Sequence, residues 1–279
     1  MELVAASKMR KAVSAVLGTR PYSKLAWETV LSIGEKIDTS LHPLLRHSAI
    51  TKKVLLLVMS SDRGLAGGYN SNLLKAVMKE VKELGSEVEI QTICVGKRGA
   101  DAMRRAKLPI LASFTGITNN TKFEEALPIG RLVISEFVSG GYDKVLLAYT
   151  DFISAINQKP LVLELLPLGK PLLTLANTDV AGGSDESVLK STIEHTFEPD
   201  PRAVLDRMLP RLIETMVYQA VLESAASEHS ARMMAMRSAS DNAAEMVDDL
   251  KFTFNQARQA GITQEIAEIS SGKAALESK

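Results

Sequence analysis

Apolar residues recur every three or four positions over the last third of the chain, which is the spacing of one helix face. From Arg211 to Ala260 there is neither glycine nor proline, and Asp200-Pro201 has the form of a helix N-cap followed by a first-turn proline. A helix from 201 to a stop near Gly272 would be about 105 Å long. A compact chain of this size has a radius of gyration of only about 19 Å. The pattern therefore predicts a helix that projects from the body.

The spacing within this helix is also that of a coiled-coil seam, with small residues where the backbone of a partner could come close. The first 45 residues repeat the spacing and are predicted to supply the second helix, with a kink or break near Gly18 and Pro21. The seam positions are Leu205, Leu209, Leu212, Met216, Met233, Met236, Ser240, Ala243, Val247, Leu250, Phe254, Ala257 and Gly261 in the later segment, and Ala26, Val30, Ile33, Ile37, Leu41 and Leu44 in the first.

The middle of the chain alternates strand patterns with helix patterns. Val54–Met59 is a continuous apolar run, which is typical of a parallel strand covered on both faces. The alternation predicts an open, partly parallel α/β sheet. Further strands are predicted at 89–95, 110–114, 145–149 and 161–166, helices at 73–84, 99–106 and 123–138, a loop at 176–187 and a weak edge strand at 192–197.

Composition narrows the class of protein. The 279 residues are 46% apolar, and 33 basic residues balance 33 acidic ones, which argues against a nucleic-acid binder. The single cysteine, Cys94, excludes a disulfide framework, and its apolar strand predicts an inert, buried thiol. The sequence has no apolar run of about 18 residues and no secretory signal pattern.

The first 24 residues are basic, with Lys8, Arg10, Lys11, Arg20 and Lys24 against Glu2. Because no broad apolar face accompanies these charges, we expect a strip that faces solvent or a partner rather than a membrane surface.

The loop most suggestive of chemistry is SSDRGLAGGYN at 60–70, between a predicted buried strand and a helix. Phosphate-binding loops occupy such places. This loop matches neither G-x-G-x-x-G nor G-x-x-x-x-G-K-[ST], and no lysine follows the glycines. We therefore favour a tight strand-to-helix turn and keep nucleotide binding as the alternative. The scattered histidines form no H-E-x-x-H motif and no G-x-S-x-G occurs, so no catalytic, cofactor-binding or metal-ligating residue is predicted.

Four stretches resemble one family, the gamma subunit of F-type, proton-transporting ATP synthase. Residues 60–70 are similar to the family's S-[ST]-D-R-G-L-C-G-G-x-N, with alanine at the cysteine position. The other stretches are MELVAASKMRKA at 1–12, EPDP at 198–201, and ESAASEHSARMMAMRSASDNAAEM at 223–246 followed by NQARQAGITQEIAEISSG at 255–272.

The resemblance implies an architecture and a mechanical function. Segments 1–48 and 200–279 would form an antiparallel, left-handed coiled coil, and 49–199 a Rossmann-like α/β foot. The coil would be the central shaft inside a ring of three alpha and three beta subunits, with the foot near the epsilon subunit and the membrane c-ring. Proton-driven rotation would present different faces to the beta subunits and so shift their conformations during ATP synthesis, or run in reverse with ATP hydrolysis.

The family implies no bond chemistry in this chain. We also predict no cofactor, and no nucleic-acid partner because of the balanced charge. Membrane association would arise only through the c-ring, at the cytoplasmic face of a bacterial plasma membrane in preference to the mitochondrial matrix side. Residues matched to ring-contacting positions are Met1, Lys8, Arg232, Arg258, Gln259, Thr263 and Glu265, and those matched to the c-ring side of the foot are Phe197 and Glu198.

The chain departs from the family at its start. Relatives usually begin some twenty residues earlier, so we expect a first helix truncated at its start, through a late gene start, trimming or a naturally short chain. We expect a frayed helix after about Ala257 in consequence. Two rival functions stay open: a nucleotide-binding α/β enzyme, which saturable nucleotide affinity would reveal, and a self-associating coiled-coil scaffold, which a homodimer in sedimentation would reveal.

Overall fold

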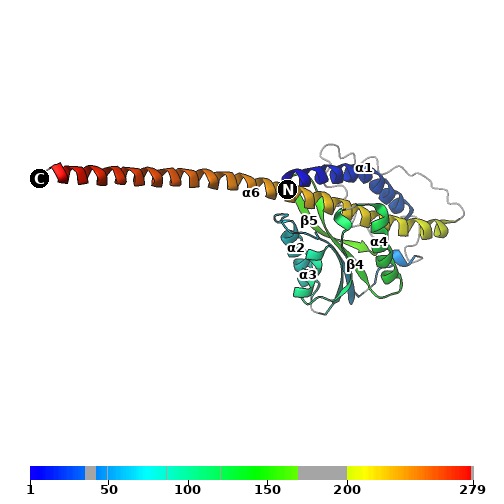
Figure 1. Ribbon diagram of the computed structural model, residues 1–279. Coiled ribbons are helices and arrows are strands. Elements are labelled where there is room, and N and C mark those ends of the chain that lie inside the picture. The colour runs from blue at the N-terminus through cyan, green and yellow to red at the C-terminus, as the bar shows by residue number, and fades with distance from the viewer. Residues whose placement is uncertain (35–41, 49, 86, 120, 169–199, 278–279) are drawn as a thin grey trace. The chain divides into compact units, whose positions relative to one another are not determined.

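The computed structural model describes residues 1–34, 42–48, 50–85, 87–119, 121–168 and 200–277 (Figure 1). Two compact units divide the chain, Met1–Met234 and Ala235–Lys279. The predicted loop at 176–187 and edge strand at 192–197 lie outside the described residues.

A five-stranded sheet is the centre of the first unit, with the strand order β3-β2-β1-β4-β5. The strands are β1 (Lys53–Met59), β2 (Glu89–Val95), β3 (Ile110–Phe114), β4 (Lys144–Phe152) and β5 (Gln158–Leu166). The first four are parallel, and β5 pairs antiparallel with β4. The predicted open, partly parallel sheet is confirmed, and β2 and β3 have the predicted bounds.

Helices cover both faces of this sheet, which explains why β1 is apolar along its length. On one face, Val54, Leu56 and Val58 pack against α2 (Tyr69–Leu84) and α3 (Lys97–Arg105). On the other, Leu55 and Leu57 pack against α4 (Phe123–Val138), the start of α6 (Pro201–Glu277) and the short helix η2 (Pro43–Leu45). Figure 1 shows α2 and α3 on the side of the sheet opposite α4.

The long helix α6 begins where the sequence predicts. The Asp200 side chain accepts a hydrogen bond from the Ala203 amide at 2.9 Å, as an N-cap does. The predicted stop near Gly272 is wrong, because α6 continues to Glu277. A glycine ends a helix when it adopts a left-handed conformation, and neither Gly261 nor Gly272 has a positive φ.

The first part of the predicted coiled-coil seam has a different partner from the one expected. Leu205, Leu209 and Leu212 are buried in the core formed by the sheet and α4. Leu44 also lies in that core, on η2 rather than on the first helix. Periodicity shows that a helix face is apolar, but it does not show which surface covers that face.

The N-terminal helix α1 (Glu2–Gly34) continues through Pro21, so the helix is not broken there, and Figure 1 shows it bending along its length. It lies antiparallel to α6. Ala12 and Val16 pack with Leu222, Ala225 and Ala226, together with Phe152 of β4. The expected pairing of the two terminal helices is confirmed over this stretch, while the side chains of the seam from 26 to 41 lie outside the described part of the chain.

Candidate functional site

The loop at 60–70 follows β1 at the carboxyl end of the parallel strands, where ligands bind in many α/β folds. In this protein the polar groups of the loop bond to the protein itself. The Ser60 hydroxyl donates to the Val95 carbonyl at 2.9 Å and accepts from the Gly99 amide at 2.8 Å. The Asn70 side chain accepts from the Ser61 amide at 3.1 Å. These bonds support the interpretation as a tight strand-to-helix turn.

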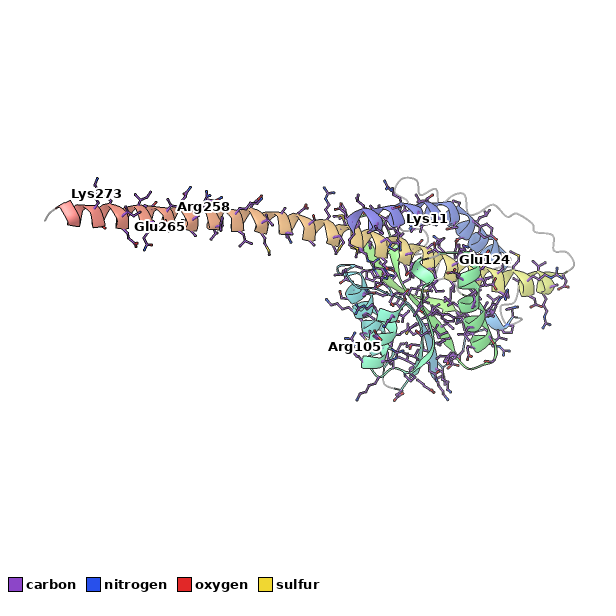
Figure 2. The ribbon with its side chains drawn as sticks, viewed as in Figure 1. Lys11, Arg105, Glu124, Arg258, Glu265 and Lys273 are labelled. Carbon is purple, nitrogen blue, oxygen red and sulfur yellow. The ribbon has the colours of Figure 1, made fainter. Side chains whose placement is uncertain are left out.

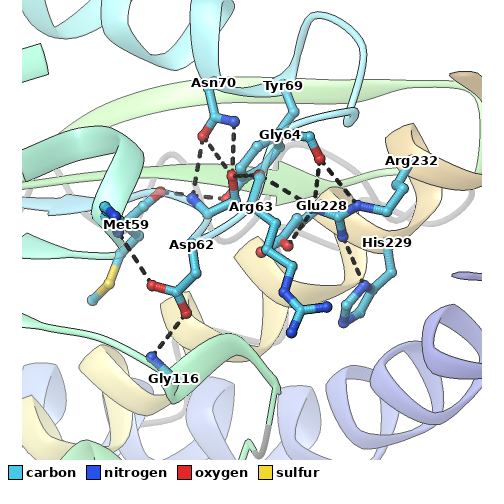
Figure 3. A network of polar contacts seen from close by, with 12 residues as sticks. Met59, Asp62, Arg63, Gly64, Tyr69, Asn70, Gly116, Glu228, His229 and Arg232 are labelled. Atoms are coloured by element: carbon cyan, nitrogen blue, oxygen red, sulfur yellow. Dashed lines mark hydrogen bonds and ion pairs between the residues drawn. The ribbon is translucent and has the colours of Figure 1, made fainter. Parts of the chain in front are cut away.

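Asp62 is a carboxylate of this loop that bonds to two backbone amides outside the loop. Its carboxylate accepts from the Lys97 amide at 3.1 Å, at the N-terminus of α3, and from the Gly116 amide at 2.8 Å (Figure 3). A helix N-terminus favours negative charge. The side chain thus joins the segments that follow β1, β2 and β3.

Arg232 of α6 is the side chain that holds this loop to the long helix (Figure 3). Its Nη2 lies 2.8 Å from Glu228 Oε1, one turn earlier. The guanidinium also donates to the carbonyls of Gly64 and Arg63, at 3.4 Å each. Since the Arg232 side chain is 14% exposed and that of Glu228 only 4%, this ion pair is largely removed from solvent.

Burial changes the titration of both neighbours of Arg232. It raises the pKa of the Glu228 carboxyl, and the Arg232 charge opposes that rise. Burial, assisted by the Arg232 charge, lowers the pKa of His229 to about 4. At neutral pH His229 is therefore uncharged, and its Nδ1, 3.3 Å from Arg232 Nη1, can accept a hydrogen bond from the guanidinium.

A second polar cluster joins α1, β4 and α6. Arg20 of α1 lies between two carboxylates, with Nε 3.3 Å from Glu223 Oε1 and Nη2 3.3 Å from Asp151 Oδ1. The same Nη2 donates to the Phe152 carbonyl at 2.8 Å. Gln219 donates to Glu223 at 2.9 Å, and its carbonyl oxygen accepts from the Thr19 hydroxyl at 2.6 Å. Five polar side chains thus fix the helix pair to the sheet.

The sequence did not predict this cluster. Arg20 was expected on a strip facing solvent or a partner, and it instead pairs within the chain. The only sequence signal is Glu223, a charged residue beside a run of small residues, 224–227, that pack closely. Burial raises the pKa of Glu223 to about 7, and the nearby Asp151 charge adds to the rise.

Of the residues matched to ring contacts, three lie in the first unit. Met1 is exposed just before α1, and Lys8 is exposed on α1, where its charge reaches His229. Arg232 is engaged within the chain, as described above. Phe197 and Glu198, matched to the c-ring side, lie outside the described residues.

The other four matched residues lie on α6 in the second unit, and all are exposed. Arg258 and Glu265 are seven residues apart and so share one helix face; both are labelled in Figure 2. Gln259 and Thr263 are four apart and share a neighbouring face, where the Thr263 hydroxyl donates to the Gln259 carbonyl at 2.8 Å. Apolar side chains are exposed on the same helix, at Leu250, Phe254, Ile262, Ile266 and Ile269.

The remaining candidate groups for chemistry are the single cysteine and clusters of metal-ligating side chains. Cys94 is buried, as predicted, and burial raises the pKa of its thiol. Within those ranges no three His, Cys, Asp or Glu side chains are placed to hold a metal ion. None of the helices described is both long and apolar enough to cross a membrane.

Comparison with known proteins identifies the family. The family model described as ATP synthase matches residues 1–276. The chain is 40% identical over 277 residues to the ATP synthase gamma chain of Pelotomaculum thermopropionicum, covering 99% of this chain and 92% of the relative. It is also 40% identical over 276 residues to the gamma chain of Moorella thermoacetica, with the same coverage.

A solved structure agrees with the sequence relatives. A chain from the central stalk and c-ring structure of the Tetrahymena thermophila mitochondrial ATP synthase is 26% identical, with a TM-score of 0.62. The match covers 86% of this chain and 97% of that one. This chain therefore belongs to the ATP synthase gamma chain family.

Proposed function

We propose that this chain is the central rotor shaft of an ATP synthase and is itself non-catalytic. It would couple proton-driven rotation of the c-ring to conformational cycling of the beta subunits during ATP synthesis, and would run in reverse with ATP hydrolysis. The observation that carries the proposal is 40% identity to gamma chains over 99% of the chain. The partners would be three alpha and three beta subunits, the epsilon subunit and the c-ring.

A shaft needs firm attachment between its helices and its foot, and two polar clusters support that role. Arg20 ties α1 to β4 and α6, and Arg232 ties α6 to the loop after β1. Both guanidiniums bond to backbone carbonyls as well as carboxylates, which fixes position more firmly than an ion pair alone. Torque applied to the sheet would thus reach the helices through direct bonds.

We divide the rotor into three functional parts: 1–48 and 200–279 as the coiled-coil segments and 49–199 as the foot. Ring contacts are proposed at Met1, Lys8, Arg232, Arg258, Gln259, Thr263 and Glu265, and c-ring contacts at Phe197 and Glu198. A rotor acts as a ligand whose different faces stabilise different beta conformations. The proposed location is the cytoplasmic face of a bacterial plasma membrane, where the c-ring would hold the chain peripherally.

Reconstitution tests the proposal. Alpha and beta subunits from the same source should show little cooperative ATPase activity until this chain is added, and the three should then purify together. ATP hydrolysis with a fluorescent bead on the foot should make that bead rotate. Saturable nucleotide affinity of this chain without any effect on alpha and beta would instead favour an α/β enzyme, and a stable homodimer would favour a scaffold.

A further inference from the structure

The Arg232 side chain has five N–H groups, and four of them have acceptors among the described residues. Its Nε donates to the Gly64 carbonyl at 3.4 Å. Its Nη2 lies 2.8 Å from Glu228 Oε1 and donates to the Arg63 carbonyl at 3.4 Å. One N–H of Nη1 is directed to His229 Nδ1, 3.3 Å away. A single N–H, on Nη1, is therefore left without an acceptor in the described part of the chain.

The position of His229 decides where its own proton lies. An arginine has donors only, so the ring nitrogen that faces its Nη1 must act as an acceptor. Nδ1 is therefore unprotonated, and the neutral ring carries its proton on Nε2. Burial and the Arg232 charge also lower the pKa of His229 to about 4, against an opposing backbone hydrogen bond at Thr118, which agrees with a neutral ring at pH 7.

Sequence spacing places both side-chain partners of Arg232 on one side of α6. Glu228 and His229 precede Arg232 by four and three positions, so they lie one helical turn earlier and next to the guanidinium (Figure 3). The carboxylate holds Nη2 and the imidazole holds Nη1. Because the guanidinium is planar and rigid, these contacts together fix the direction of the last Nη1 N–H.

We propose that His229 is a positioning residue for the contact between Arg232 and the alpha/beta ring: its Nδ1 holds one N–H of Nη1 and aims the other at the partner subunit. This inference rests on the proposed function, in which Arg232 contacts the ring. It also defines the chemistry of the partner group. A bidentate carboxylate needs two parallel N–H groups of the guanidinium, and only one N–H is left over by the described residues. The partner group is therefore a single oxygen acceptor.

Substitutions at His229 test the positioning role in the enzyme reconstituted with this chain. His229→Leu removes the acceptor and should lower ATP synthesis by about two- to tenfold, the range that one hydrogen bond supplies. His229→Asn keeps an acceptor oxygen near the place of Nδ1 and should recover most of that loss. Ser230→Ala is the matched control: it removes a bond of 2.7 Å between α6 and the Ala155 carbonyl without touching Arg232, so synthesis should not change.

A double variant separates positioning from a purely structural role. Arg232→Lys keeps the positive charge beside Glu228 but lacks the planar fork, so it should lower synthesis by itself. If His229 acts through Arg232, adding His229→Leu to Arg232→Lys should lower synthesis no further. A double variant that shows the product of the two single losses would overturn the inference, because His229 would then act independently of Arg232.

Two other results would overturn the inference, and they differ in what else they remove. If Arg232→Lys leaves synthesis unchanged in an enzyme that depends on this chain, the proposed ring contact at Arg232 fails as well. If Arg232→Lys lowers synthesis and His229→Leu does not, only the role of His229 fails. An enzyme whose activity does not depend on this chain at all would instead remove the proposed function itself.

Nuclear magnetic resonance of the full chain decides the protonation of His229 even where a variant fails to fold. The chain has four histidines, so ¹⁵N labelling of their rings gives few signals. Substituting His42, His47 and His195 one at a time assigns the remaining signals to His229. At pH 7 we expect a neutral ring with its proton on Nε2. A charged ring, or a proton on Nδ1, would place two donors face to face and overturn the inference.

Discussion

Arg20 Nε lies 3.3 Å from Glu223 Oε1, although the two residues are 203 positions apart in the sequence. The same guanidinium reaches Asp151 of β4 at 3.3 Å. One cation thus pairs with two neighbouring carboxyl groups, whose negative charges would repel each other in its absence. Since these residues belong to α1, β4 and α6, the bond joins the N-terminal helix, the sheet and the long helix at one point.

Replacing Arg20 with methionine should therefore destabilise the fold. The variant keeps the apolar stem but leaves Asp151 and Glu223 facing each other without a cation. We expect a loss of about 1–3 kcal/mol in the free energy of unfolding, below the value for a fully buried pair because the Arg20 side chain is 38% exposed. Urea unfolding of the full chain measures the loss. Arg10→Met, at an exposed position of the same helix, is the control, and an equal loss there would contradict the assignment.

Stability should depend on pH through Glu223. Burial and the Asp151 charge raise its pKa in the folded state to about 7 from 4.5. The folded state therefore binds more protons than the unfolded state between these values, and stability falls as pH rises from about 4.5 to 7. Burial is the main cause of this rise in the pKa of Glu223 and the Asp151 carboxylate adds to it, whereas Gln219 and Arg20 oppose it; Tyr149 also lies near this carboxyl.

Glu223→Gln should remove this pH dependence. Between pH 4.5 and pH 7 the unmodified chain should lose up to about 3 kcal/mol of unfolding free energy that the variant does not lose. Chemical unfolding at pH 5, 6, 7 and 8 measures it. A difference that stays constant over this range would mean that Glu223 titrates as an ordinary carboxyl.

Arg232 and Glu228 should show strong coupling. Arg232→Met leaves the buried Glu228 carboxylate without its cation. We expect it to lower the free energy of unfolding by about 3–5 kcal/mol. Adding Glu228→Gln removes that charge and should restore part of the loss. Unfolding of the two single variants and the double variant gives the coupling energy. Arg237→Met, at an exposed position five residues later, should change stability by less than about 0.5 kcal/mol.

Gly96, between β2 and α3, should not accept alanine. Its φ is +93°, and a Cβ there would collide with the Ser60 carbonyl. Gly116 offers a matched control, since its φ is +86° but nothing lies within 4 Å of an added Cβ. Gly116→Ala should lower the free energy of unfolding by about 1–2 kcal/mol because of the left-handed backbone alone. Gly96→Ala should lower it by clearly more, because the contact with Ser60 is added. Thermal unfolding of both variants shows which of them loses more stability. Similar losses would mean that the contact between the added Cβ and Ser60 is relieved at little cost.

The proposed ring contacts on α6 should affect coupling without affecting the fold. Alanine at Arg258, Gln259, Thr263 and Glu265 together removes exposed polar groups, so the thermal stability of the chain should change little. ATP synthesis by the reconstituted enzyme should fall by roughly tenfold if these groups contribute about 1.4 kcal/mol to rotor–ring contacts. Glu245→Ala, exposed on the same helix, is the control. Unchanged synthesis by the fourfold variant would remove these residues from the proposed surface.

Local patterns determined much of this fold. The apolar run at 54–59 predicted a strand covered on both faces, and Asp200-Pro201 predicted the start of α6. Both signals act within a few residues, through side-chain burial and capping, so they can be read without knowledge of distant neighbours. The motif at 60–70 likewise showed that a strand-to-helix turn was favoured over a phosphate loop.

Tertiary structure decided which surfaces meet. The apolar face at Leu205, Leu209 and Leu212 has helical spacing in the sequence, but only the folded chain shows that the sheet and α4 cover it. Arg20 looked like one basic residue among several until folding brought Asp151 and Glu223 to it. Sequence spacing fixes the direction of a side chain along its own helix or strand. Its partner can come from a chain segment as far as 203 positions away, as Glu223 does for Arg20, because the packing of the whole core brings such segments together.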